Sequence, residues 1–126
     1  MDADVPKKIL VVDDDPRWIS IIAEEIVKID QDVQVITANT KEQALAIIDS
    51  IGAGLFGVVS DLSLTEKGQE GFTIVLRAKR AGIPNVALHT ANVSTSVGVF
   101  CVKEDIEHWS KGPNTENLQE WLFPEL

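Results

Sequence analysis

The residues best suited to chemistry are carboxylates that directly follow short apolar runs. Three of them stand in a row after residues 8–12, namely Asp13, Asp14 and Asp15. A second apolar run, residues 55–60, ends in Asp61. Adjacent carboxylates repel one another unless water, a cation or hydrogen-bond donors compensate them. Taken alone, the acidic row is read equally well as a solvated turn, with Asp15 as the N-cap of a helix that begins at Pro16.

Two further polar side chains follow apolar runs later in the chain. Residues 85–90 form an apolar run that ends in Thr90, and residues 106–110 precede Lys111. In an open α/β sheet, ligands bind at the edge where the carboxyl ends of parallel strands meet. We therefore expect one site to contain Asp13, Asp14, Asp61, Thr90 and Lys111. His89 is predicted to be a packed strand residue rather than a part of this chemistry.

The elements that position these residues are strands alternating with helices. Short apolar runs at 8–12, 32–38, 55–61, 85–90 and 106–110 are typical of strands buried on both faces of a parallel sheet. Helical spacing follows four of them, at 16–29, 40–51, about 72–80 and 114–122. The segment 93–105 is rich in β-branched residues, which favours a strand, whereas the alternation favours a short helix. We expect the helix, and hence a doubly wound parallel α/β domain.

Composition limits the classes of function. The chain has 126 residues, enough for one domain, and its net charge of −9 without a Lys/Arg cluster argues against direct binding to nucleic acid. No apolar run is long enough to cross a membrane, and no signal peptide begins the sequence, so we expect a cytoplasmic protein without a membrane partner. The single cysteine, Cys101, is predicted to be a small buried or half-buried apolar residue and suits a reducing compartment.

In this order, the polar residues resemble those of the receiver domain of two-component response regulators, the family that includes the chemotaxis regulators. The resemblance runs from about Lys8 to Leu122. It implies a flavodoxin-like (βα)5 three-layer sandwich with sheet order 2-1-3-4-5. It also implies a single receiver domain over residues 1–126, with its core at about 8–123 and a flexible start at 1–7.

The resemblance implies a function and a set of roles. A histidine kinase or phosphotransfer protein would pass a phosphoryl group from a phosphohistidine to Asp61, with Mg²⁺ as the cofactor. Asp14 and Asp61 would bind the metal directly, Asp13 through water, and Ser63 through its backbone carbonyl. Thr90 would donate a hydrogen bond to the phosphoryl group, and Lys111 would pair with it. Such a receiver assists its own phosphorylation and dephosphorylation and is a signalling module rather than a metabolic enzyme.

The switch that the resemblance implies involves Thr90 and the aromatic position of the fifth strand. That position is His108 here, where the family has Tyr or Phe. The loop after Asp61 is longer than usual and has Thr65 where the family has Pro, and Gly112 separates Lys111 from Pro113. A homodimer or an output partner would use the face made by the helix at 93–105, the strand at 106–110 and the final helix.

Two other functions fit the same residues. The first is a receiver-like interaction module that works without phosphorylation and uses the apolar segment from Val93 to Trp109 as its contact face. The second is a small phosphohydrolase with a haloacid-dehalogenase-like core. Its nucleophile would be Asp13, because Asp13 and Asp15 follow the first strand and Thr90 and Lys111 come later in the same order.

Overall fold

The computed structural model describes residues 7–65, 68–90, 94–110, 118, 120 and 121. Several expectations concern residues outside these ranges. They are the flexibility of residues 1–6, the placement of Lys111, the Gly112–Pro113 bond and the start of the final helix at Asn114.

The described chain forms a five-stranded, all-parallel sheet with the order β2-β1-β3-β4-β5. This is the predicted order, and it confirms the flavodoxin-like fold. The strands are β1 (Lys8–Val12), β2 (Gln34–Ala38), β3 (Gly57–Ser60), β4 (Asn85–Thr90) and β5 (Glu107–Ser110). The helices are α1 (Pro16–Ile29), α2 (Lys41–Ile51), the short 3-10 helix η2 (Gly52–Gly54), α3 (Glu70–Arg80) and α4 (Thr95–Glu104).

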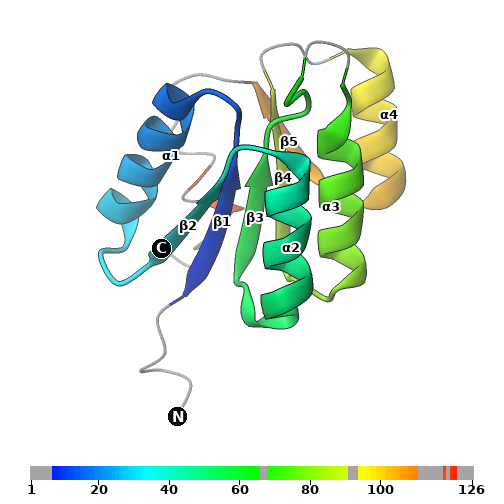
Figure 1. The fold of residues 1–126 in the computed structure, drawn as a ribbon. Coiled ribbons are helices and arrows are strands. Elements are labelled where there is room, and N and C mark those ends of the chain that lie inside the picture. The colour runs from blue at the N-terminus through cyan, green and yellow to red at the C-terminus, as the bar shows by residue number, and fades with distance from the viewer. Residues whose placement is uncertain (1–6, 66–67, 91–93, 111–117, 119, 122–126) are drawn as a thin grey trace.

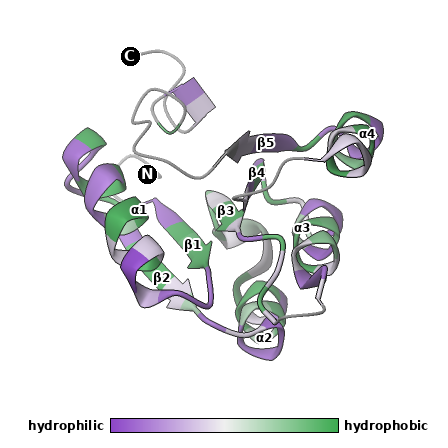
Figure 2. Cartoon of the chain, turned by 90° about the horizontal axis from the view of Figure 1, so that it is seen from above, coloured by the Kyte–Doolittle hydropathy of each residue, from purple (hydrophilic) through white to green (hydrophobic). Residues whose placement is uncertain are grey.

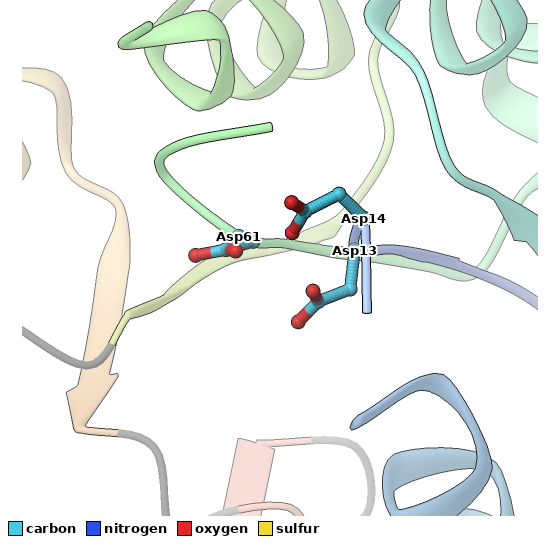
Figure 3. Close-up of side chains that lie close together, drawn as sticks. All are labelled: Asp13, Asp14 and Asp61. Carbon is cyan, nitrogen blue, oxygen red and sulfur yellow. The ribbon is translucent and has the colours of Figure 1, made fainter. Parts of the chain in front are cut away.

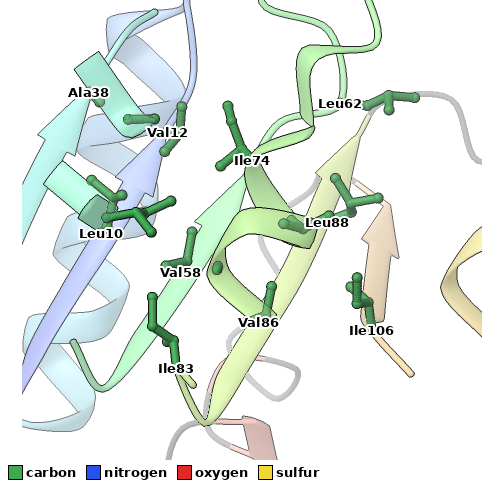
Figure 4. Packing of buried hydrophobic residues seen from close by; sticks show 14 of the residues in the cluster. Leu10, Val12, Ala38, Val58, Leu62, Ile74, Ile83, Val86, Leu88 and Ile106 are labelled. Atoms are coloured by element: carbon green, nitrogen blue, oxygen red, sulfur yellow. The ribbon is translucent and has the colours of Figure 1, made fainter. Parts of the chain in front are cut away.

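Helices cover the two faces of this sheet. Helix α1 lies over one face, and α2, α3 and α4 lie over the other (Figures 1 and 2). Because successive strand residues point to opposite faces, Leu10 and Val12 join the core beneath α2 and α3, while Ile9 and Val11 join the core beneath α1. Figure 4 shows the larger of these two cores. The central strands are buried on both sides, which explains their continuous apolar sequences.

Side-chain caps fix where the helices begin. The Asp15 carboxylate accepts the backbone N–H of Arg17 at 2.9 Å, as predicted for the N-cap of α1. Thr40 caps α2 by accepting the N–H of Gln43 at 3.2 Å. Ser94 caps α4 by accepting the N–H of Val97. The segment with conflicting signals is therefore a helix, as the alternation predicted.

Several element boundaries differ from the expected ones by one or two residues. Strand β2 begins at Gln34 rather than at residue 32, because the N–H of Asp32 bonds to the Asp30 side chain and that of Val33 to the Asp30 carbonyl, which forms a turn. Strand β3 begins at Gly57 rather than at residue 55, after η2. Helix α3 begins at Glu70, two residues before the expected start near Phe72.

Among the described helices, none is both long enough and apolar enough to cross a membrane.

Candidate functional site

The register of the sheet places two aspartates side by side. Val12, the last residue of β1, is aligned with Ser60, the last residue of β3. The residues that follow them, Asp13 and Asp61, therefore lie side by side at the same edge of the sheet. The N–H of Asp61 donates to the Val12 carbonyl at 2.8 Å, and the N–H of Asp13 donates to the Ala38 carbonyl at 3.2 Å. Each aspartate is therefore held by a backbone bond to the neighbouring strand.

Three carboxylates converge at this edge (Figure 3). One oxygen each from Asp13, Asp14 and Asp61 can be chosen so that all three atoms lie within 4.8 Å of one another. Their surroundings differ: Asp13 is fully buried, Asp61 is 7% exposed and Asp14 is exposed. The Asp13 carboxylate also accepts the backbone N–H of Asp15 at 2.9 Å, which fixes its orientation. The sequence predicted this gathering of Asp13, Asp14 and Asp61.

This donor set suits a hard divalent cation. Carboxylate oxygens are preferred by Mg²⁺, which is commonly held by one or two carboxylates and keeps several waters. Three carboxylates so close together repel one another, and a cation between them removes that repulsion. The exposure of Asp14 leaves one side of the cluster open to solvent, from which the waters and a phosphate could come.

Thr90 is the last residue of β4, the strand next to β3. Ser60 is aligned with Leu88, so Thr90 lies just beyond the level of Asp61 on the adjacent strand, and its side chain is buried. Thr90 is in turn aligned with Ser110 of β5, the residue that directly precedes Lys111 in the chain. The sheet therefore brings Thr90 to the carboxylate edge, as predicted, while the Lys111 side chain is outside the described residues.

The loop after Asp61 is organised by Glu70, the first residue of α3. The Glu70 carboxylate accepts the hydroxyl of Thr65 at 2.6 Å and the N–H of Leu64 at 3.3 Å. The hydrogen bond from Thr65 is the main reason that the pKa of Glu70 lies below its ordinary value. Ser63, the expected carbonyl ligand, is exposed, and its hydroxyl donates to the Gly68 carbonyl at 2.8 Å. These bonds tie residues 63–65 to the start of α3.

Gly71 is a supporting residue that the sequence did not predict. Its N–H donates to the Leu62 carbonyl at 2.8 Å, which joins the first turn of α3 to the segment that leaves Asp61. A Cβ at this position would lie 2.6 Å from the Leu62 Cα and in contact with the Asp61 carbonyl oxygen, which is backbone and cannot move aside cheaply. Its only sequence signal is a glycine that follows Asp61 after a loop.

The two histidines lie on opposite faces of the sheet. His89 is buried, as predicted, and its ring makes edge contacts with Trp18 of α1 at 5.7 Å and with Trp109 of β5 at 6.4 Å between centroids. His108, the predicted switch residue, is half-buried and aligned with Leu88, so it shares a face with Thr90. The fold thus places His108 and Thr90 on the same side of the sheet.

Comparison with solved structures identifies the fold. Chemotaxis protein CheY4 of Vibrio cholerae matches with a TM-score of 0.73 and 19% identity, covering 97% of this chain and all of that one. The cyanobacterial phytochrome response regulator RcpA, in a phosphorylated state, matches with a TM-score of 0.76 and 18% identity over 97% and 98% of the two chains. The chain has the fold of a response regulator receiver domain.

Another structure with the receiver fold carries a modified aspartate and an ion. A response regulator from Burkholderia pseudomallei contains a phosphorylated aspartic acid and a calcium ion, and matches with a TM-score of 0.76 and 20% identity over 92% of this chain and 66% of that one. No protein-family model matches the sequence, and no curated protein matches it either. The receiver fold is therefore recognised here through structure, at low sequence identity.

Proposed function

We propose that the protein is a phospho-accepting receiver that takes a phosphoryl group onto Asp61 in a two-component or phosphorelay system. The observation that carries the proposal is the convergence of Asp13, Asp14 and Asp61 within 4.8 Å at the strand edge of a receiver fold. As a signalling module of the cytoplasm it would act by contact with partners rather than by turnover of a metabolite.

The burial of the carboxylates favours Asp61 as the nucleophile. A nucleophile must reach phosphorus, and Asp13 is fully buried with one oxygen held by the Asp15 N–H, whereas Asp61 retains some exposure. An Asp61 oxygen would form the new P–O bond while the P–N bond to the donor imidazole breaks. The imidazole nitrogen leaves with the bonding electron pair. The same comparison argues against a phosphohydrolase that uses Asp13.

The carboxylates would hold Mg²⁺ through Asp14 and Asp61 directly, through Asp13 by way of water and through the Ser63 backbone carbonyl. Bound there, the ion would offset negative charge on the transferring phosphoryl group. The hydrogen bond from the Asp15 N–H at 2.9 Å fixes the orientation of the Asp13 carboxylate, which supports a fixed role for Asp13 beside the ion. Asp14, which is exposed, would be the ligand nearest the incoming donor.

Thr90 and Lys111 would complete the site on the neighbouring strands. The Thr90 hydroxyl would donate to a phosphoryl oxygen. Its position supports that role, because Thr90 lies on β4 one residue beyond the position level with Asp61. Lys111 would supply a positive charge that pairs with Asp61 in the empty site and with a phosphoryl oxygen in the loaded one. The role of Lys111 is supported by its place in the chain, because it directly follows Ser110, the residue aligned with Thr90.

Phosphorylation would be read on the face that contains α4 and β5. Thr90 and the half-buried His108 share this side of the sheet, and α4 exposes Val99 and Val102, which are 63% and 81% exposed. A shift of Thr90 toward a phosphoryl oxygen would bias the arrangement of His108, and so the surface that an output partner contacts. The donor would be a histidine kinase or a phosphotransfer protein.

Intact-mass measurement after incubation with acetyl phosphate and Mg²⁺ tests the proposal. The wild-type chain is expected to gain the mass of one phosphoryl group, and Asp61→Asn is expected to lose that gain. Asp15→Asn is the matched control: it removes a charge from the same acidic row and keeps a good N-cap, so it should be phosphorylated like the wild type.

A folded wild-type chain without the mass gain would contradict the proposal and favour an interaction module that does not depend on phosphorylation. A gain that survives Asp61→Asn would place the acceptor elsewhere. Steady hydrolysis of a generic phosphomonoester, lost in Asp13→Asn but kept in Asp61→Asn, would instead favour the phosphohydrolase.

A further inference from the structure

Strand β2 is an edge strand whose sequence carries no protection against pairing. It pairs with β1 on one side only, and no other strand in the described part of the chain lies on its outer side. Proteins usually protect such edges with charged residues, proline or bulges. The sequence of β2, Gln-Val-Ile-Thr-Ala, contains neither a charge nor a proline, whereas the opposite edge strand, β5, begins with Glu107.

The backbone groups of this edge can be assigned from the bonds to β1. The Gln34 N–H donates to the Lys7 carbonyl at 2.8 Å, and the Ala38 carbonyl accepts the Asp13 N–H at 3.2 Å. Because N–H and C=O groups alternate in direction along a strand, those of Val35 and Thr37 point away from β1. They form a short ladder that a further strand could use.

An apolar groove lies beside this edge. It has a volume of about 420 Å³ and runs between the second half of α1 and the start of β2. Its lining is Ala23, Glu24, Val27, Lys28, Val33 and Val35. Val27 is 40% exposed there, and α1 and β2 can be followed side by side in Figures 1 and 2. The groove therefore offers apolar area next to backbone groups that, within the described residues, no other strand pairs with.

The charges of the groove are self-complementary. Glu24 and Lys28 are one helical turn apart on α1, so two copies of α1 placed antiparallel bring Glu24 of each opposite Lys28 of the other. Among the described residues, no ion pair includes Glu24. Lys28 contacts Glu25 at 3.2 Å, and a surface pair of this kind contributes little and can be exchanged.

We propose that this groove and the β2 edge bind a second copy of the chain about a two-fold axis. The axis would run roughly perpendicular to the sheet, join the two β2 strands antiparallel and place the two α1 helices side by side. Such a contact closes on itself and stops at a dimer. The groove is at the end of α1 and β2 remote from Asp13 and Asp14, so this inference does not depend on the proposed phosphorylation.

Sedimentation equilibrium of the full chain over a range of concentrations tests the dimer. The weight-average mass is expected to rise from 13.8 kDa toward twice that value and no further. Glu24→Lys and Lys28→Glu each place like charges across the axis and should raise the dimer dissociation constant by about tenfold or more. The double exchange Glu24→Lys/Lys28→Glu restores opposite charges and should bring the constant back to within about threefold of wild type.

Two further variants separate this contact from general effects. Glu24→Lys makes the net charge of −9 less negative, so general repulsion predicts tighter association and the groove dimer predicts weaker association. Lys103→Glu, on α4, makes the same charge change as Lys28→Glu and should leave the constant unchanged. Thr37→Pro removes an outward N–H without removing a bond to β1, and it should weaken the dimer while circular dichroism confirms the fold.

Several results would overturn the inference. A chain that stays at 13.8 kDa at every concentration has no such dimer. Masses that rise beyond the dimer would mean an open-ended contact. If Lys103→Glu disrupts the dimer, or if the two single charge reversals leave it intact, the dimer uses another face. If the double exchange does not restore dimerisation, the Glu24–Lys28 pairing is ruled out.

Discussion

Asp13 and Asp61 stand at equivalent positions on neighbouring strands but differ in their freedom to react. The Asp13 carboxylate is buried and accepts the N–H of Asp15, which suits a fixed role beside a metal. Asp61 keeps partial exposure, and the Ser60 hydroxyl donates to its backbone carbonyl at 2.9 Å, which steadies the main chain rather than the carboxylate. At the scale of single residues, burial therefore distinguishes Asp13, the candidate for a fixed role beside a metal, from Asp61, the candidate acceptor.

Cys101 provides a prediction at the same scale. It is buried, and this burial, together with the negative charge of Glu107, raises the pKa of its thiol above the ordinary value. The thiolate is the reactive form, so its fraction at pH 8 is smaller in the folded chain than in the unfolded one. Alkylation by iodoacetamide at pH 8 is expected to be roughly tenfold slower, or more, in native than in urea-unfolded protein. Equal rates in the two states would contradict the prediction.

At the scale of elements, two glycines in helices give opposite predictions. Gly71→Ala would press a methyl group against the backbone of Asp61 and Leu62, so we expect a loss of about 1–3 kcal/mol in the free energy of unfolding. A methyl group on Gly98 of α4 would have no atom of the described residues outside its own helix within 4 Å. Because alanine has a higher helix propensity than glycine, Gly98→Ala should raise the free energy of unfolding by about 0.5–1 kcal/mol. Urea titration measures both.

These two substitutions control for each other, because each exchanges glycine for alanine within a helix. Similar changes in both variants would mean that helix propensity dominates and that Gly71 is not needed for the close approach to Asp61. Gly71→Ala is also expected to slow phosphorylation, since the segment that leaves Asp61 must shift, whereas Gly98→Ala should leave the rate unchanged.

The sequence predicted the order of elements, because buried strands and amphipathic helices have distinct periods. It predicted the cap of α1 from Asp15, since capping depends on neighbours in the chain. It placed the start of α3 too late, because the bond of Gly71 to Leu62 and those of Glu70 to the loop join residues that only the folded chain brings together. The groove at β2 was missed for the same reason.

At the scale of the whole molecule, the sheet joins separate parts of the sequence into one site. Parallel strands in the order β2-β1-β3-β4-β5 place the ends of β1, β3 and β4 next to one another, so Asp13, Asp61 and Thr90 meet although they are far apart in the chain. Strand β2 and helix α4 lie on different sides of the molecule (Figure 2), so the groove beside β2 is far from the exposed valines of α4. The proposed phosphoryl acceptor, the proposed dimer contact and the proposed output face therefore occupy different parts of one small domain.

The central claim is that Asp61 receives the phosphoryl group, and reductive trapping tests it most directly. The chain is incubated with acetyl phosphate and Mg²⁺ and treated with borohydride, which converts an aspartyl phosphate to homoserine. Tandem mass spectrometry of the peptides then locates the modified residue. We predict homoserine at position 61 alone, and only when both acetyl phosphate and Mg²⁺ are present. Homoserine at position 13, or none in the folded protein, would contradict the account.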